Sequence, residues 1–270
     1  MLKVLTWRVT DDDSFFQPAL NVLDRQHGVE LVNSDCDVVL VVGAKSIGMS
    51  DVVKAARQLN LPDEKLLGDW IVCLPGFTLD KYRQLQRSQL SIVAQHCFGG
   101  LISHTLGLPF RSPTVNMFFR EKDFMKFLRT LPACLNDSLT FKSTRFDEGT
   151  KLNYPVVTLG DVEIHMNHYG DFDTAVDAWN RRKARINWRN LFVTMYTAGE
   201  ETAREFDALP FGKKVCFVPF ESDIASAWHI NPTTRGLELW DAVNRFGVGD
   251  PFYYDPFDML LYGLKTPLET

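Results

Sequence analysis

The chain has 270 residues, of which 45% are hydrophobic and 23% are charged. This length and composition are typical of a globular protein with a substantial core, arranged as one large or two smaller domains. The formal net charge of −5 and the isoelectric point of about 5.7 argue against a general electrostatic grip on nucleic acid or on an anionic membrane. We therefore expect no nucleic-acid partner.

The apolar runs and the cysteines indicate in which cellular compartment the protein is expected. No apolar run approaches the roughly 20 residues that cross a bilayer, and no stretch of signal-peptide length follows the first residues. The cysteines are odd in number, widely spaced and without a C-x-x-C pair, which favours reduced thiols over a disulfide framework or a zinc site. We expect a cytoplasmic protein with no transmembrane segment and no bound metal. The cysteines are Cys36, Cys73, Cys97, Cys134 and Cys216.

The first third of the chain alternates apolar runs with helix-length segments. The run 37–43 is continuously apolar after its first residue, as a strand buried on both faces requires. Strands separated by helices indicate βαβ crossovers and a mostly parallel sheet. Residues 1–89 are therefore predicted to form a Rossmann-like or flavodoxin-like α/β lobe. Its predicted strands are 4–7, 29–32, 37–43 and 70–74, and its predicted helices include 50–59 and 80–87.

The pattern from residue 90 onward predicts a second α/β lobe, residues 90–270, with a mixed sheet. Gly160-Asp161 between two apolar runs, 155–159 and 162–166, is typical of a hairpin. The boundary between the lobes is expected near residues 88–90. Other predicted strands are 91–94, 116–119, 191–196 and 214–218, and the predicted helices are 98–106, 123–131, 172–185 and 200–208.

A partial glycine motif runs from Gly43 to Gly48, directly after the predicted buried strand. Glycines and a helix N-terminus at this place can cradle a phosphate. The full G-x-G-x-x-G and Walker A spacings are both missing, so a tight strand-to-helix turn explains the pattern as well. Gly43, Lys45 and Ser46 are the candidate cofactor-binding residues, for a cofactor whose identity stays open.

A second candidate site lies where a predicted strand runs into Cys97-Phe98-Gly99-Gly100. A thiol at the start of a helix has its pKa lowered by the helix dipole and by nearby N–H groups, which makes a nucleophile. His104 follows seven residues later, about two helical turns on, and could share the face of Cys97. A buried cysteine at a glycine-rich packing corner is the structural alternative.

A third candidate is the segment 163–169, which contains Glu163, His165 and His168. In a strand Glu163 and His165 project to one face, where they could form an acid–base or orienting pair, while His168 projects to the other. The alternative is a set of polar side chains satisfied by hydrogen bonds at a sheet end. Asn116 and His168 are added as candidate substrate-binding residues.

A fourth candidate is a basic cluster, in which five cations fall between residues 181 and 189. On a helix, Arg181, Arg185 and Trp188 would share one face, and Arg182 lies beside them. Guanidinium groups suit phosphate or carboxylate, and tryptophan offers a stacking plane for a sugar or a base. A solvated helix face paired with upstream aspartates explains the cluster equally well.

Three long segments resemble one bacterial family. They are 91–118 continued by 123–128, then 154–169, and then 178–192. The resemblance covers roughly residues 90–220, and it is to a domain of unknown function whose members are often described as exopolysaccharide or capsular polysaccharide biosynthesis proteins. Phe98 stands where that family favours tryptophan after the cysteine, a change that keeps an aromatic residue. The resemblance implies a setting in surface-glycan assembly and carries over no catalytic residue.

These observations together favour a transferase of polysaccharide biosynthesis that acts on an activated or phosphorylated sugar. Cys97, Glu163 and His165 are its candidate catalytic residues, with a sugar phosphate or nucleotide sugar as ligand and other polysaccharide-assembly proteins as possible partners. The alternative is a non-catalytic glycan-binding or scaffold protein of the assembly machinery. A nucleotide-dependent oxidoreductase is a third reading, which rests only on the glycine turn and the fold. The candidate substrate-binding residues are His104, Asn116, His168, Arg181, Arg182, Arg185 and Trp188.

Overall fold

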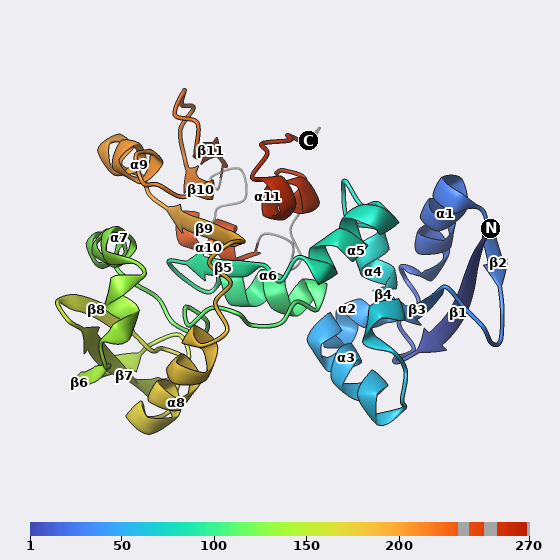
Figure 1. Cartoon of the computed structure of the whole chain (residues 1–270), viewed down its shortest axis with the longest axis horizontal. Coiled ribbons are helices and arrows are strands. Elements are labelled where there is room, and N and C mark those ends of the chain that lie inside the picture. The colour runs from blue at the N-terminus through green and yellow to red at the C-terminus, as the bar shows by residue number, and fades with distance from the viewer. Residues whose placement is uncertain (232–237, 246–252, 269–270) are drawn as a thin grey trace. The chain divides into compact units, whose positions relative to one another are not determined.

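The computed structural model describes residues 1–231, 238–245 and 253–268 (Figure 1). The chain divides into two compact units. Unit 1 comprises residues 1–89, 102–109 and 252–270, and unit 2 comprises residues 90–101 and 110–251. These units differ from the predicted ranges 1–89 and 90–270, because a helical segment and the C-terminal segment pack with the first part of the chain.

Unit 1 is built on a four-stranded sheet in which every paired strand is parallel, in the order β2-β1-β3-β4. All five residues of β3 are buried, as its unbroken apolar sequence predicts. The parallel-sheet α/β character predicted for this part is confirmed. The strands are β1 (Leu2–Arg8), β2 (Val29–Leu31), β3 (Val38–Val42) and β4 (Leu66–Gly68). The helices are α1 (Phe16–His27), α2 (Ala44–Ile47), α3 (Met49–Gln58), η1 (Asp63–Lys65), α4 (Asp69–Val72), α5 (Leu79–Arg87) and α11 (Pro256–Tyr262).

One predicted strand of unit 1 is wrong. Residues 70–74 were expected to be extended, but Asp69–Val72 form the short helix α4, and the strand is the preceding β4. The carboxylate of Asp69 accepts hydrogen bonds from the N–H groups of Gly43 and Ala44, which turns the chain out of the sheet at this residue. The apolar side chains that suggested a strand are buried on α4 instead, Ile71 and Val72 among them.

Unit 2 contains two separate sheets, so the prediction of one mixed sheet in this part of the chain is wrong. A parallel sheet has the order β11-β10-β9-β5, and an antiparallel sheet has the order β6-β7-β8. The strands are β5 (Ser91–Ala94), β6 (Thr140–Asp147), β7 (Leu152–Leu159), β8 (Val162–His165), β9 (Leu191–Tyr196), β10 (Lys213–Val218) and β11 (Ala227–His229). Helix α6 (Phe98–Leu106) begins in unit 2, and its residues from 102 onward belong to unit 1. The other helices of unit 2 are α7 (Glu121–Thr130), η2 (Ala133–Asn136), α8 (Phe172–Lys183), α9 (Glu200–Asp207) and α10 (Leu239–Arg245).

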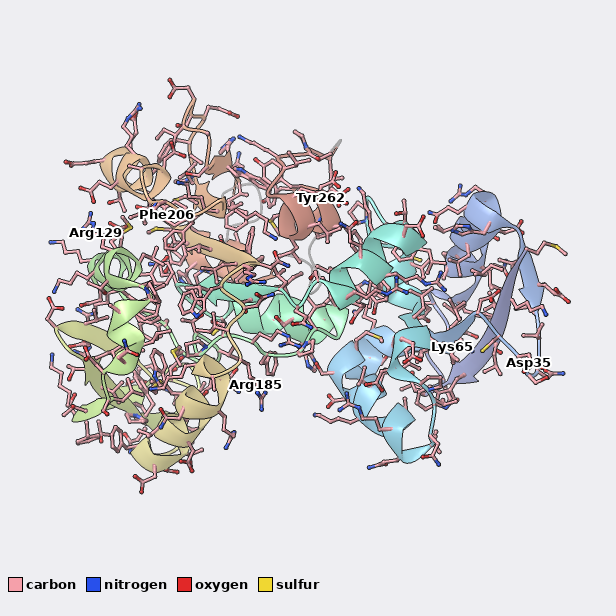
Figure 2. All side chains as sticks on the ribbon, viewed as in Figure 1. Asp35, Lys65, Arg129, Arg185, Phe206 and Tyr262 are labelled. Atoms are coloured by element: carbon pink, nitrogen blue, oxygen red, sulfur yellow. The ribbon has the colours of Figure 1, made fainter. Side chains whose placement is uncertain are left out.

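One hydrophobic core serves both sheets of unit 2. Phe124 and Phe127 of α7 pack with Trp179 of α8, and the same core includes Ile164 of the antiparallel sheet and Val193 of the parallel sheet. In Figure 1, α7 lies beside β8, which it contacts. In Figure 2, the labelled residue Phe206 marks α9, where its fully buried ring joins this core. The two sheets therefore form a single packed body with a common interior.

The segment 116–119 is not a strand, contrary to expectation. Phe118 makes a single isolated bridge to His165, with both backbone hydrogen bonds at 2.9 Å. Asn116 has φ +63°, a left-handed conformation that interrupts an extended run. The segment instead follows β5, because the N–H of Ala94 donates to Thr114 Oγ1 and the N–H of Phe119 donates to the carbonyl of Gln95.

Candidate functional site

Cys97 lies at the carboxyl end of β5, immediately before the first residue of α6. The two glycines that follow let this helix approach its neighbours closely. A Cβ on Gly99 would come within 3.1 Å of the Ala94 and Ile92 side chains, and one on Gly100 would come within 3.2 Å of Val115. Glycine is therefore needed at positions 99 and 100 for close packing, and this packing positions the Cys97 thiol after the end of β5.

His168 provides a basic nitrogen next to this thiol. Its Nε2 lies 3.4 Å from Sγ of Cys97, within hydrogen-bonding distance for sulfur. Strand β8 ends at His165, and the chain then turns, with the N–H of Tyr169 donating to the carbonyl of Met166. The hydroxyl of Tyr169 donates to the carbonyl of Val115, which anchors the turn beside α6. A thiol and an imidazole at this separation have the geometry of a nucleophile and its general base.

The thiol of Cys97 is partly shielded from solvent, and this shielding changes its acidity. Burial raises the pKa of Cys97 above its ordinary value, against a smaller opposite effect of a hydrogen bond from its own N–H. The expectation that the helix start lowers this pKa is therefore wrong, because desolvation of the thiolate outweighs the helix terminus. At neutral pH the resting residue is a thiol, so its reactivity depends on a base that removes the proton.

Asn116 lies close to the first turn of α6. Its side chain is exposed, and Oδ1 lies 3.9 Å from the position that a Cβ on Gly100 would occupy. Arg182 braces the chain on which Asn116 lies: Nη1 donates to the carbonyl of Val115 at 3.1 Å and to the hydroxyl of Tyr169 at 2.5 Å. The guanidinium also stacks over the ring of Phe110. Arg182 thus supports the chain around the Cys97–His168 pair, and its role in holding phosphate stays a prediction.

Glu163 and His165 are brought together as predicted, on the antiparallel sheet. Nε2 of His165 lies 3.1 Å from Oε1 of Glu163, and Nδ1 lies 3.2 Å from the hydroxyl of Tyr154. The imidazole is 1% exposed and stacks on the ring of Phe118. Glu163 also pairs with Lys142. Within the described chain, neither Glu163 nor His165 contacts Cys97 or His168, so the two candidate groups are separate.

The enclosure of His165 predicts a pH dependence of stability. Burial lowers its pKa, although Glu163 opposes the shift. The unfolded chain therefore binds this proton first as the pH falls below about 6.5, and stability is lost progressively below that value. We expect His165→Gln to flatten the decline between pH 7.5 and pH 5.5, by at most about 1.4 kcal/mol per pH unit.

Urea unfolding at these two pH values measures the effect. The matched control is His27→Gln, because His27 is exposed at the end of α1 and should leave the pH dependence of the wild type intact. Identical pH dependences for wild type and His165→Gln would contradict the assignment of a lowered pKa to this imidazole.

His104 lies away from Cys97. It belongs to the part of α6 that packs in unit 1, where its Nε2 would lie 2.2 Å from a Cβ on Gly48. Its carbonyl accepts a hydrogen bond from the Ser50 hydroxyl at 3.3 Å. The seven residues from Cys97 to His104 correspond to about 10 Å along the helix axis, so the two side chains do not form a pair.

The basic cluster does not form one helical face. Helix α8 ends at Lys183, so Arg185, labelled in Figure 2, and Trp188 lie in the turns that follow. The N–H of Asn187 donates to Ser91 Oγ at the amino end of β5, which directs the chain away from the helix axis. The upstream aspartate Asp171 caps α8 through Thr174.

Trp188 and Cys97 lie at opposite ends of the parallel sheet. Trp188 precedes the first residue of β9, whereas Cys97 follows the last residue of β5, and Ser91 of β5 pairs with Leu191 of β9 in parallel register. A four-residue strand spans about 13 Å, so the sheet keeps the two side chains apart. The predicted substrate-binding set therefore divides between two locations.

The glycine turn of unit 1 holds an internal carboxylate. Asp69 is 1% exposed and accepts hydrogen bonds from the N–H groups of Gly43 and Ala44, at 2.8 and 3.2 Å. The ammonium of Lys45 lies over the Phe15 ring, and the hydroxyl of Ser46 donates to Asp12. Burial raises the pKa of Asp69. A cofactor phosphate at this turn stays a prediction, and it would have to displace Asp69 from these two N–H groups.

Residues 73–262 match a domain of unknown function, DUF1919. The chain belongs to the DUF1919 family. An uncharacterized protein of Haemophilus influenzae is similar: it is 33% identical over 181 residues, which are 65% of this chain and 84% of that protein. The matched range contains the Cys97–His168 pair and the Trp188 region, whereas the glycine turn of the DUF1919 protein lies outside it.

The described part of the DUF1919 protein contains neither a group of metal-binding side chains nor a membrane-spanning helix. In residues 1–231, 238–245 and 253–268, no group of three or more histidine, cysteine or acidic side chains is placed to hold a metal ion. Across these same residues, no helix has both the length and the apolar character needed to cross a membrane.

The Cys97–His168 contact and the support from Tyr169 and Arg182 were missed from the sequence. His168 was assigned to the strand face opposite Glu163 and His165, but β8 ends before it. The contact between His168 and Cys97 joins positions that are 71 residues apart in the chain, so no local sequence pattern indicates it. The signal that existed was chemical: a cysteine nucleophile needs a base, and a histidine lay in the third candidate segment.

Proposed function

We propose that the DUF1919 protein is a group-transfer enzyme in which Cys97 is the nucleophile and His168 is the general base. The transferred group is an acyl group and the acceptor is a sugar hydroxyl, in the surface-polysaccharide setting that the sequence resemblance implies. The observation that carries this proposal is the 3.4 Å separation of Sγ and Nε2 at the start of α6.

The chemistry proceeds in two halves. His168 accepts the proton of the Cys97 thiol as sulfur attacks the acyl carbonyl, and a carbon–sulfur bond forms. The bond from that carbonyl to the donor's leaving group then breaks, and the leaving group receives the proton from His168. In the second half His168 removes a proton from the sugar hydroxyl, whose oxygen attacks the thioester. The ester forms, the carbon–sulfur bond breaks, and the proton returns to the sulfur.

The start of α6 supports this assignment of roles. The field of a helix N-terminus favours negative charge, so it stabilises an oxyanion that develops beside Cys97. His165 is a weaker candidate for the base, because its ring is 1% exposed and contacts Glu163 and Tyr154. Asn116 is exposed beside the first turn of α6, which supports its assignment as a substrate-binding residue.

A non-catalytic glycan-binding or scaffold protein is the second candidate function. The raised pKa of Cys97 favours it, since a thiol that stays protonated at neutral pH is inert without an effective base. The discriminating property is thus whether His168 activates Cys97. The nucleotide-dependent oxidoreductase is not proposed, because the N–H groups of the glycine turn are engaged by Asp69 and the fold alone is poor evidence for a function.

An activated ester tests the proposal without knowledge of the natural donor. With p-nitrophenyl acetate we expect a burst of nitrophenolate from the wild type, followed by turnover that sugar acceptors accelerate. Cys97→Ser and His168→Asn should each slow the burst by about 100-fold or more. His229→Asn is the matched control, since His229 pairs with Glu221 on the surface of unit 2. An unchanged burst in Cys97→Ser would overturn the proposal.

A further inference from the structure

The turn after α8 presents a large aromatic side chain to solvent. Trp188 is 46% exposed, in contrast to Trp179 of the preceding helix, which is 1% exposed. Two adjoining grooves meet at this indole and share Pro132 as well. Their volumes are about 340 and 470 Å³, a size suited to one or two sugar rings. We call these two grooves and the indole between them the Trp188 surface.

Among the described residues, the charged groups of the Trp188 surface are all cations. Arg189 and Lys213 line one groove and Lys183 lines the other, and within this part of the chain no acidic side chain lines either groove. The whole chain has a net charge of −5, so this region is opposite in sign to the protein average. Lys183 donates to the carbonyl of Leu135, and Lys213 donates to the side-chain carbonyl of Asn190. Both of these hydrogen bonds go to neutral acceptors.

The ammonium group of Lys213 is one of the cations that line the Trp188 surface. Lys213 is half-buried, and burial lowers the pKa of its ammonium group. A partly desolvated cation is stabilised by an anionic ligand more than a fully hydrated one, because solvent screens their attraction less. The guanidinium of Arg189 lies beside the same groove and is suited to a carboxylate or a phosphate.

We propose that the Trp188 surface binds a sugar residue that carries a carboxylate or a phosphate. The indole stacks on the C–H face of the sugar ring, and the cations of the adjoining grooves bind its anionic group. The site is separate from Cys97, because the two lie at opposite ends of the parallel sheet. It therefore goes beyond the proposed transfer reaction and would hold a glycan chain whether or not Cys97 is a nucleophile.

Binding of defined saccharides to the whole chain tests this proposal. The probes are tetragalacturonate, which presents carboxylates, glucose 1-phosphate, which presents a phosphate, and maltotetraose as a neutral chain. We expect calorimetric binding of at least one anionic sugar at low salt, weaker at high salt, and little binding of maltotetraose. Trp188→Ala should weaken that binding by about tenfold or more.

The controls separate this site from other causes of binding. Trp240 is 51% exposed on α10, so Trp240→Ala is the matched tryptophan substitution and should leave affinity unchanged. Cys97→Ser should also bind normally, which distinguishes failure of this site from failure of the transfer reaction. Arg189→Ser should weaken binding of the anionic sugar and leave any weak binding of maltotetraose unchanged.

Three results would overturn the proposal. The first is equal affinity of wild type and Trp188→Ala for the anionic sugar that binds, and the second is binding of maltotetraose to the wild type as tight as that of this anionic sugar. The third is absence of binding by both anionic probes at concentrations up to about 10 mM. Binding of inorganic phosphate is measured in the same way. If it binds as tightly as glucose 1-phosphate, the surface binds the anion alone and does not recognise a sugar.

Discussion

Replacing His168 by asparagine is expected to slow the alkylation of Cys97 by iodoacetamide at pH 7 by about tenfold or more. Burial raises the pKa of Cys97, so little thiolate exists at neutral pH unless a neighbour accepts the proton. His168 Nε2 lies 3.4 Å from Sγ, and no other side chain of the described residues is recorded in hydrogen-bonding contact with that sulfur. Asparagine keeps a polar side chain at this position but cannot accept the proton.

The pH dependence separates loss of the base from damage to the fold. At strongly alkaline pH, hydroxide removes the thiol proton in both proteins, so their alkylation rates should converge. His168 is exposed, so the substitution should leave thermal stability unchanged. A His168→Asn variant that is slow at every pH would indicate blocked access to Cys97 and would count against a base.

Peptide mass mapping makes this measurement specific to Cys97. Cys36 and Cys73 are also partly exposed and would otherwise contribute to the signal. Burial raises the pKa of Cys73 to about 11, so it reacts slowly at pH 7. Cys36→Ser provides a background in which the Cys97 peptide is followed most simply. Equal rates for wild type and His168→Asn at pH 7 would contradict the nucleophile–base assignment.

Replacing Asp69 by alanine is expected to destabilise unit 1 by about 3 kcal/mol. The carboxylate accepts hydrogen bonds from three backbone N–H groups, those of Gly43, Ala44 and Trp70, at 2.8, 3.2 and 2.7 Å. At 1% exposure for Asp69, water does not readily replace the lost acceptor. The raised pKa of Asp69 shows that burying the carboxylate itself costs free energy, but its removal leaves the N–H groups unpaired, which costs more.

Hydrogen exchange measured by mass spectrometry on the β3 peptide reports this loss within unit 1. Asp69→Asn keeps one acceptor oxygen and should fall between the wild type and Asp69→Ala. Asp13→Ala is the surface control, because Asp13 forms an exposed ion pair with Arg8 and should leave exchange in β3 unchanged. If Asp69→Ala exchanges at the wild-type rate, the carboxylate does not hold the turn in place.

Local sequence patterns predicted several elements that are mostly buried or that have a distinctive turn. Strand β3 is apolar at every position, and α6 has the predicted bounds 98–106. The hairpin β7–β8 was recognised from its turn, where Gly160 has φ +59°. Strand β6 was missed because it is an edge strand, exposed along most of its length, and has no alternation of apolar and polar residues. The misassigned segment 70–74 shows that an apolar run does not distinguish a short buried helix from a strand.

The candidate site was only partly predictable, for a reason of distance along the chain. The sequence indicated Cys97 at a glycine-rich strand end and a glutamate–histidine pair on a hairpin, and both features are present. It could not indicate that the turn after β8 places His168 at the thiol, since this depends on Tyr169 reaching Val115, 54 residues away. Nor could it show that Arg182 is used to brace this arrangement, because a guanidinium suits a carbonyl as well as a phosphate.

The most direct test of the account is to look for the thioester itself. Wild-type protein is mixed with p-nitrophenyl acetate, quenched in acid during the burst and analysed by intact and peptide mass spectrometry. We expect one added acetyl group on the peptide that contains Cys97, and this group should be removed by neutral hydroxylamine and be absent from Cys97→Ser. Turnover of the ester with no acetyl group on Cys97, or acetylation that persists on another residue in Cys97→Ser at the same rate, would contradict it.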